Sequence, residues 1–421
     1  MNAVLYALPV FLLLIFMELC WSLVTGKKAF RAADSLTSMN IGAISEISRG
    51  LVKTVTFGLY GLLELTVGLV DFTASDPMAW VLAFILYDFF YYWAHRAGHE
   101  VNILWAAHST HHSSEEFNMA TAMRQSATTV FYVWIFYLPM AVLGIPVEVF
   151  VPISFASLFY QFWVHTTLIP KMGWYDKIFI SPSNHRVHHG QNGYAIDVNY
   201  GATLILWDRL FGTYAEESDA EPVIYGIRKP VKTWNPVWAN LVILTRIVVD
   251  IWHTSGWKNR LMKLFGPPGW EPESNAVQKT AFSPSGFRRF VTPVGRWQFR
   301  YALFSYVMTT ALFGHFLTMA YSMPLDQRFA YGGLIIFSAM CTGWVLEGKR
   351  WAVLLELVRG VAVTAALLAG LWFSPVSETF QILAVIGLAV MLTLYALMWR
   401  EGVAVGAMPQ PGTDKLRVAE Q

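Results

Sequence analysis

The chain has 421 residues, of which 55% are hydrophobic and only 14% are charged, and its net charge is +2. Soluble domains usually carry about 25% charged residues, so this composition argues against a soluble enzyme and indicates a membrane protein. The small net charge gives no reason to expect nucleic acid as a partner. The two cysteines, Cys20 and Cys341, both lie in apolar runs and offer neither a disulfide framework nor a thiolate metal site.

Nine apolar runs predict an all-α, polytopic membrane protein with about nine transmembrane helices, because about 20 apolar residues cross a bilayer as a helix. The runs cover residues 3–24, 51–70, 78–94, 127–144, 147–164, 301–321, 329–346, 351–373 and 380–399. The first run lacks a basic start and a small-residue cleavage site, so we expect a retained helix and not a signal peptide. Gly144-Ile145-Pro146 predicts the turn of a helical hairpin.

Outside these runs, residues 238–265 alternate apolar and basic positions and predict a helix that lies in the membrane interface. Pro267-Pro268-Gly269 then begins a polar linker. Glu356 and Arg359, three residues apart in one run, predict an intrahelical ion pair. The expected parts are N-terminal transmembrane helices at 1–75, a histidine-rich region at 76–235, the interfacial helix and linker at 236–300, C-terminal transmembrane helices at 301–400 and a polar tail at 401–421.

The charges between the runs fall on two sides of the predicted membrane. If both ends of the histidine-rich region face one side, that side receives almost all the basic residues. The other side receives Asp71, Asp76, Glu148, Asp326 and Glu378, with Arg328 as its clear basic residue. The positive-inside rule then predicts a cytoplasmic histidine region, in the plasma membrane of a bacterium or the endoplasmic reticulum of a eukaryote.

Nine of the 11 histidines lie between residues 95 and 189, in three tight groups and one single position. Helical residues three or four apart share a face, so each group can direct two or three imidazoles at one point. Neutral imidazole is the commonest metal ligand, and the pattern therefore predicts a metal site. The predicted metal ligands are His95, His99, His108, His111, His112, His165, His185, His188 and His189.

The spacing narrows the metal chemistry without fixing the metal. A zincin needs His-Glu-x-x-His, but Arg96 occupies the glutamate position. Sets of four or five imidazoles would serve two ions and leave open positions for oxygen or solvent. Two redox-active irons beside lipid suit activation of O₂ against unactivated C–H bonds, which zinc, lacking redox chemistry, cannot perform. A metal-binding membrane transporter is the alternative from another class, although it should carry ionisable residues near mid-membrane in several spans.

Several polar residues near the histidines have both a functional and a structural interpretation. Asp88 lies two helical turns before His95 and can hold the second N–H of a ligand, or be a polar residue buried against another helix. Arg124 and Gln125 can bind a phosphate or pterin, or extend to the lipid headgroups. Four further polar residues flank the last histidine group and can either orient ligands or form turns and caps: Asn184, Asp197, Asn199 and Asp208.

The order of the histidine groups, with membrane hairpins between them, resembles the fatty acid hydroxylase/sterol desaturase superfamily. The resemblance covers about residues 88–214 and is greatest to the alkylglycerol monooxygenase branch. It rests on residues 88–100 (DFFYYWAHRAGHE), 108–126 (HSTHHSSEEFNMATAMRQS) and 184–214 (NHRVHHGQNGYAIDVNYGATLILWDRLFGTY).

The resemblance implies that residues 76–235 are a fatty acid hydroxylase-like di-iron catalytic region, which hydroxylates a lipid alkyl chain with O₂. Glu100 would be a required carboxylate, and the histidines named above would bind two Fe ions. In the ether-lipid branch a tetrahydropterin supplies the electrons, and hydroxylation beside the ether oxygen releases an aldehyde and glycerol. The histidine boxes specify neither the lipid nor the electron donor. A sterol or carotenoid hydroxylase or desaturase with a separate redox partner protein therefore stays open.

Overall fold

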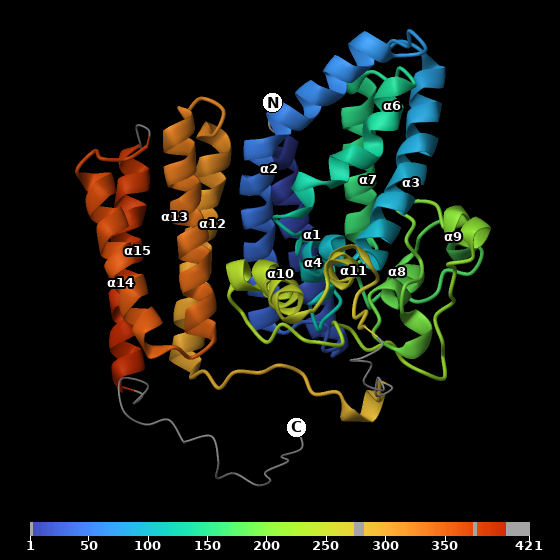
Figure 1. Ribbon diagram of the computed structural model, residues 1–421. Helices are drawn as coiled ribbons and strands as arrows, with labels where there is room; N and C mark the ends of the chain where they lie inside the picture. The colour runs from blue at the N-terminus through green and yellow to red at the C-terminus, as the bar shows by residue number, and fades with distance from the viewer. Residues whose placement is uncertain (1–2, 273–281, 374–376, 401–421) are drawn as a thin grey trace. The chain divides into compact units, whose positions relative to one another are not determined.

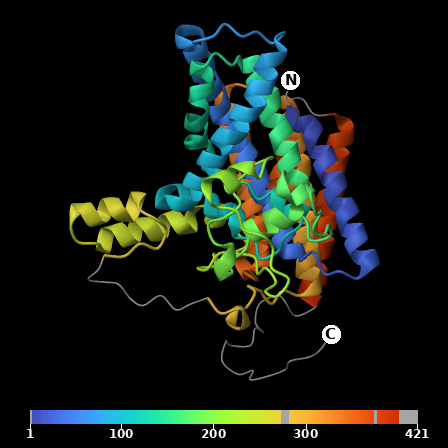
Figure 2. The ribbon, with the colours of Figure 1, turned by 90° about the vertical axis from the view of Figure 1, so that its right-hand side faces the viewer.

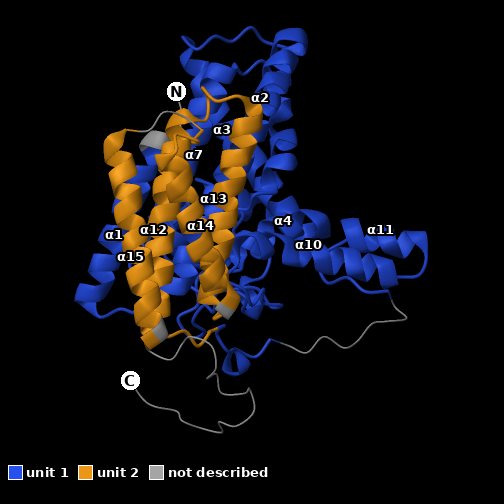
Figure 3. Cartoon of the chain, turned by 90° about the vertical axis from the view of Figure 1, so that its left-hand side faces the viewer, with its two compact units in different colours: residues 1–290 blue, residues 291–421 orange. Residues whose placement is uncertain are grey.

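The computed structural model describes residues 3–272, 282–373 and 377–400 of the chain (Figure 1). These described residues form helices and two isolated β-bridges, with no extended strand among them, which confirms the predicted all-α class. The contacts divide the chain into two compact units, residues 1–290 and 291–421, which Figure 3 colours separately. The predicted polar tail at 401–421 lies outside the described residues.

In the first unit, α1, α2, α3 and α7 stand upright, and the short helices α4 and α8 lie beside their lower parts (Figures 1 and 2). The helix bounds are α1 Ala3–Thr25, α2 Ala32–Val67, α3 Pro77–Glu100, α4 Asn102–His112, α5 Met119–Ala122, α6 Leu138–Val142, α7 Val147–Trp163, α8 Pro182–His188, α9 Leu206–Phe211, α10 Pro236–His253 and α11 Trp257–Phe265. The 3₁₀ turns are η1 Thr129–Phe131, η2 Val133–Tyr137, η3 Tyr175–Lys177, η4 Gly193–Ala195 and η6 Pro284–Gly286.

Helix α2 differs from the predicted span at residues 51–70, because it begins at Ala32 and has 36 residues. Its first half buries polar side chains, including Asp34, Ser38 and Asn40, against the rest of the unit. An apolar window overlooks such a segment, since hydropathy does not register tertiary contacts such as those of Asp34 and Ser38 with Arg124.

The predicted apolar helix at residues 127–144 is instead three short pieces, η1, η2 and α6. Pro139 has no N–H to continue a preceding helix and stands in the first turn of α6. The turn after α6 lies at Gly144, where the sequence predicts it. Gly144 has φ +89°, and a Cβ there would lie 1.9 Å from the backbone oxygen of Val70, so only glycine fits.

The predicted interfacial helix at residues 238–265 is a hairpin of two helices, α10 and α11. The chain breaks at Thr254–Gly256, where Gly256 has φ +81° and Arg260 Nε donates to the oxygen of Thr254 at 2.8 Å. The inner face of α10 packs on α4 and on the preceding chain through Val242, Ile243 and Ile247. This hairpin is therefore part of the same unit as the histidine groups.

The second unit is a four-helix bundle with short connections. Its helices are α12 Arg296–Met319, α13 Leu325–Leu346, α14 Arg350–Leu368 and α15 Glu378–Arg400. Helix α12 packs on α13 and α15, and α14 packs on the same two, which closes the bundle. Glu356 and Arg359 form the predicted intrahelical pair, with Arg359 Nε 2.7 Å from Glu356 Oε1.

Six helices in the described part of the chain are long and apolar enough to cross a membrane, namely α1, α2, α12, α13, α14 and α15. They coincide with six of the nine predicted spans. The other three predictions fall on α3, on the broken segment before Gly144 and on the 17-residue α7. The chain is thus a multi-pass membrane protein with six candidate spans.

Candidate metal centre

Three short helical segments carry the histidine groups. The last turns of α3 hold His95 and His99, and α4 ends in the second group. Helix α8 is started by a capping box, in which the Ser181 side chain accepts from the Asn184 backbone N–H, with Pro182 in its first turn. This cap ends the preceding loop sharply and fixes where the third group begins. His165 follows the last turn of α7.

The structure brings all nine predicted histidines together as two adjoining sets. The potential ligand atoms of each set lie within 4.8 Å of one another. The first set contains His95, His99, His108, His112 and His188; the second contains His111, His165, His185 and His189. The second and third sequence groups are each divided between the sets. This division depends on tertiary packing and is not visible in the spacing.

Hydrogen bonds from Nδ1 fix the direction of four of these rings. The acceptors are backbone oxygens: His95 to Tyr200 at 2.7 Å, His111 to Arg124 at 3.2 Å, His165 to Gln161 at 2.7 Å and His188 to Val198 at 2.8 Å. A carbonyl can only accept, so Nδ1 must carry the proton, and in a neutral ring Nε2 then presents a bare lone pair. These second contacts therefore aim four Nε2 lone pairs into the two sets.

These lone pairs provide a test of whether a cation fits. The Nε2 atoms of His111 and His165 lie 3.3 Å apart, although both rings carry their proton on Nδ1. Two lone pairs at that distance repel unless a cation lies beside both. The buried Nε2 of His188 has no hydrogen-bond partner, nor does a buried ring nitrogen of His185 and of His189. Buried nitrogens without partners are costly unless they bind something, so the arrangement fits metal ions.

Burial keeps eight of these imidazoles neutral. Desolvation, followed by the neighbouring imidazoles, lowers the pKa of His95 to about 3, and desolvation lowers the pKa of His165 to about 4. The same causes hold the pKa values of the other buried rings well below the usual value: His108, His111, His112, His185, His188 and His189. Neutral imidazole is the form that binds a metal.

The loop at residues 197–205 supplies two of the carbonyls and is held by two buried carboxylates. Asp208 accepts from the backbone N–H groups of Tyr200 at 2.7 Å and Gly201 at 2.8 Å. Burial raises the pKa of Asp208 to about 6 against these hydrogen bonds. Asn199, with φ +57°, donates its side-chain amide to the oxygens of Asn184 and Ala215. The flanking residues thus shape the loop that orients the histidines.

Asp88 is the second buried carboxylate that holds this loop. Its hydrogen-bond partners differ from the histidine N–H group that the sequence suggested. It accepts from the backbone N–H groups of Thr203 at 2.8 Å and Leu204 at 3.1 Å, and from Trp207 Nε1 at 2.9 Å. None of its hydrogen-bond partners among the described residues is a histidine. Asp88 instead holds the loop whose Tyr200 carbonyl accepts from the His95 ring.

Glu100 lies at the edge of the first set. Its carboxylate is 2.8 Å from Arg96 Nε, and its side chain is 45% exposed. It does not belong to either histidine set. Asp197, also at this edge and about half exposed, has a carboxylate oxygen 3.5 Å from His99 Nδ1.

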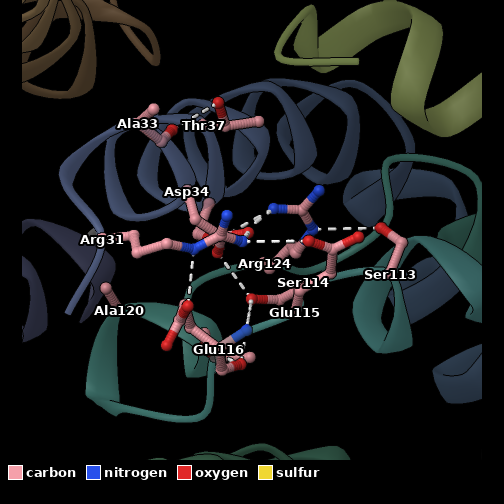
Figure 4. A network of polar contacts seen from close by, with 12 residues as sticks. Arg31, Ala33, Asp34, Thr37, Ser113, Ser114, Glu115, Glu116, Ala120 and Arg124 are labelled. Carbon is pink, nitrogen blue, oxygen red and sulfur yellow. Dashed lines mark hydrogen bonds and ion pairs between the residues drawn. The ribbon is translucent and has the colours of Figure 1, made fainter. Parts of the chain in front are cut away.

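Arg124 is buried and does not extend to lipid headgroups as one sequence interpretation allowed. Its Nε donates to the oxygen of Thr110 and to Ser113 Oγ, both at 3.1 Å, and Nη1 donates to Ser38 Oγ (Figure 4). Its own carbonyl accepts from His111. Arg124 therefore fastens the end of α4 to the segment that orients one of its histidines.

Sequence reasoning missed the charged network around Arg124. Arg31, between α1 and α2, bridges Glu116 at 2.5 Å and Glu115 at 3.1 Å (Figure 4). Arg289 lies 3.1 Å from Glu116. The signal in the sequence is the pair of glutamates that lie three and four residues after His112. Arginines from distant segments neutralise them, and that pairing is visible only in the fold.

Aromatic rings cover the histidines. Phe117 stacks on His165 with centroids 5.4 Å apart, and Trp105 lies 5.2 Å from His99. The ring of Tyr200 contacts His95, His99 and His188. Phe117 and Tyr200 were not predicted as site residues. The three rings exclude water from the imidazoles and thereby strengthen interactions within the centre.

Comparison with known proteins agrees with this geometry. The fatty acid hydroxylase family model matches residues 80–213, which hold all nine histidines. The chain is 35% identical to an alkylglycerol monooxygenase of Xenopus tropicalis over 353 residues, covering 83% of this chain and 78% of that protein. The chain belongs to the alkylglycerol monooxygenase family. It is accordingly an oxidoreductase.

Other relatives show how far the likeness extends. The human alkylglycerol monooxygenase is 41% identical over 267 residues, 63% of this chain and 59% of that protein. An ornithine lipid hydroxylase of Rhizobium tropici is 34% identical over 141 residues, 33% of this chain and 43% of that protein. The likeness to the ornithine lipid hydroxylase thus covers a much shorter part of the chain than the likeness to the alkylglycerol monooxygenases. No solved structure matches the chain.

Proposed function

We propose that this member of the alkylglycerol monooxygenase family is a di-iron enzyme that hydroxylates a lipid alkyl chain at the carbon beside an ether oxygen. The observation that carries the proposal is the pair of histidine sets, five and four residues, whose bare nitrogen atoms converge in a buried site. Their neutral nitrogen ligands suit divalent iron. The names of the relatives support an ether lipid as the substrate class.

In the proposed reaction, O₂, two electrons and two protons convert one C–H bond to C–OH and release water. The hydroxylated carbon carries an ether oxygen, so the product is a hemiacetal that separates into a fatty aldehyde and glycerol. Two iron ions, when bound, supply the activation of O₂ that an unactivated C–H bond requires. The electrons come from a tetrahydropterin, and the site faces the cytoplasm, where the sequence places most basic loops.

In this proposal, different residues of the chain have different roles. The nine histidines hold the two ions, and the loop fixed by Asp88 and Asp208 keeps His95 and His188 in the tautomer that binds. The aromatic cover excludes water. Glu100, half exposed at the edge of the site, can exchange protons with solvent and pass them inward.

The test uses the full chain reconstituted in phospholipid vesicles. Metal analysis should give two irons per chain, and an alkylglycerol with a reduced tetrahydropterin under ¹⁸O₂ should yield labelled fatty aldehyde. Omission of O₂ is the matched control. Product formed only from a sterol or carotenoid with a ferredoxin-type donor would replace this proposal with the other branch of the superfamily. Metal movement into sealed vesicles without oxidation would replace it with a transporter.

A further inference from the structure

The α10–α11 hairpin exposes large apolar side chains on both of its helices. On α11, Trp257, Leu261 and Phe265 are 69%, 46% and 59% exposed, whereas Lys263 is buried and pairs with Glu271 at 2.6 Å. A surface helix in water turns its apolar stripe inward and its charges outward. The exposed apolar stripe and the buried lysine of α11 depart from this rule and indicate an apolar medium beside the stripe.

Helix α10 also carries an exposed, mainly apolar stripe. Five of its exposed positions recur every three or four residues, which places these five in a single stripe along the helix, and Val249, Asp250 and His253 are exposed beside it. The stripe consists of Trp238, Leu241, Thr245, Val248 and Trp252, of which Trp252 is 80% exposed. Helix α10 is not among the six candidate spans.

The direction of the hairpin within the first unit indicates what covers this surface. Figure 2 shows α10 and α11 projecting crosswise to the upright helices of that unit. Two of the upright helices, α1 and α2, are candidate spans and therefore indicate the membrane normal. A hairpin perpendicular to them runs along the plane of the membrane, as amphipathic interfacial helices do.

Charges and aromatic residues on the hairpin fit a lipid surface. Exposed Lys258 and Arg260 flank the apolar stripe of α11 on its two sides, within one turn of the exposed Trp257. Tryptophan and long basic side chains are both favoured where hydrocarbon meets headgroups, because they carry an apolar body and a polar end. Their positive charge complements anionic headgroups.

We propose that the α10–α11 hairpin docks on the surface of an anionic phospholipid bilayer through the outer face that Trp238, Val248, Trp252, Trp257, Leu261 and Phe265 form. The hairpin also contacts α4 directly: Thr110 Oγ1 donates to the oxygen of Ala239 at 3.4 Å, and Asn102 Nδ2 donates to the oxygen of Lys263 at 2.7 Å. Docking thereby sets the depth of the helix that carries His108, His111 and His112. The lipid occupant follows from the hairpin itself and does not depend on the metal or on the reaction.

Spin labels on the full chain test this surface without any activity measurement. Single cysteines replace Trp252 or Leu261 after Cys20→Ser and Cys341→Ala, and each carries a nitroxide in vesicles of phosphatidylcholine with or without phosphatidylglycerol. Asp219→Cys, at a side chain that is 90% exposed in a loop, gives the value for water. Leu13→Cys, at an exposed position within the candidate span α1, gives the value for hydrocarbon. Gel filtration excludes variants that fail to fold.

Collision rates with O₂, which concentrates in lipid, and with a water-soluble nickel chelate decide the outcome. The O₂-to-nickel ratio at 252 and 261 should lie several-fold above that at 219 and approach that at 13. Lys258→Glu with Arg260→Glu should lower it only in vesicles that contain phosphatidylglycerol. A ratio equal to that at 219 would mean a water-facing surface and overturn the proposal. Low collision rates with both reagents would also overturn the proposal, because protein would then cover the surface. Spin–spin broadening would identify that protein as a second copy of this chain, and its absence would indicate a different protein.

Discussion

Both units of this protein bury groups that can be charged, and they satisfy them in opposite ways. In the second unit, Glu356 and Arg359 neutralise each other within one helix, and Ser305 donates to the carboxylate. In the first unit, nine imidazoles converge in two sets, and three of them leave a buried nitrogen without a partner. A self-satisfied pair requires nothing further, whereas convergent lone pairs require a cation. The number of hydrogen-bond partners therefore distinguishes buried groups with a structural role from buried groups that form a binding site.

The largest expected effect comes from removing one converging base. His188→Ala deletes the Nε2 that has no partner in the protein, so iron content and turnover should fall to background. His315→Ala, which removes a histidine bonded to Tyr331 in the second unit, is the matched control and should keep both. Metal analysis and aldehyde yield measure the two variants. Unchanged turnover in His188→Ala would remove it from the proposed ligands.

Carboxylates that act through the loop should matter less than the ligands. Asp88→Asn and Asp208→Asn keep the size of each side chain but weaken the acceptors that hold residues 200–204, so iron affinity or turnover should fall about 10- to 100-fold. Asp250→Asn, at an exposed acid on α10, is the control. Iron titration measures the affinity of each variant for iron. An assay at saturating iron then shows whether turnover is lost because less iron is bound. Equal behaviour of all three variants would contradict the positioning role.

Breaking the self-satisfied pair should change stability and not chemistry. Glu356→Gln leaves Arg359 buried and unpaired, which should lower the free energy of unfolding by about 3–5 kcal/mol. Replacing both residues with methionine removes the unpaired charge and should recover most of that loss. Thermal unfolding in detergent measures stability, and turnover per folded molecule should stay at the wild-type value. A fall in turnover without a fall in stability would give the second unit a part in catalysis.

Glu100 should show the smallest effect on stability, because exposed ion pairs contribute about 0–1 kcal/mol. Glu100→Gln should nevertheless lower turnover if this carboxylate moves protons as proposed. Arg96→Gln breaks the same ion pair and leaves the acid in place, so it separates the two effects. Turnover that falls equally in both variants would assign the loss to the ion pair.

Sequence reasoning found the nine histidines because periodicity and chemistry coincide in them. Residues three and four apart must share a helix face, and few side chains other than ligands are grouped in this way. The hairpin turn at Gly144 and the intrahelical pair at Glu356 were also predicted, since both depend on neighbours in the chain. The full length of α2 was not, because its buried polar half has no apolar signal.

By itself, the sequence determined the helical class, the histidine groups and the superfamily, because local periodicity and residue chemistry encode them. Only the tertiary structure decided that these groups divide into sets of five and four, that carbonyls of residues 198 and 200 fix two tautomers, and that Arg31 neutralises the glutamates after the second group. The physical reason is common to all three. Each depends on atoms brought together from segments far apart in the chain, and the spacing within one segment carries no information about its distant partners.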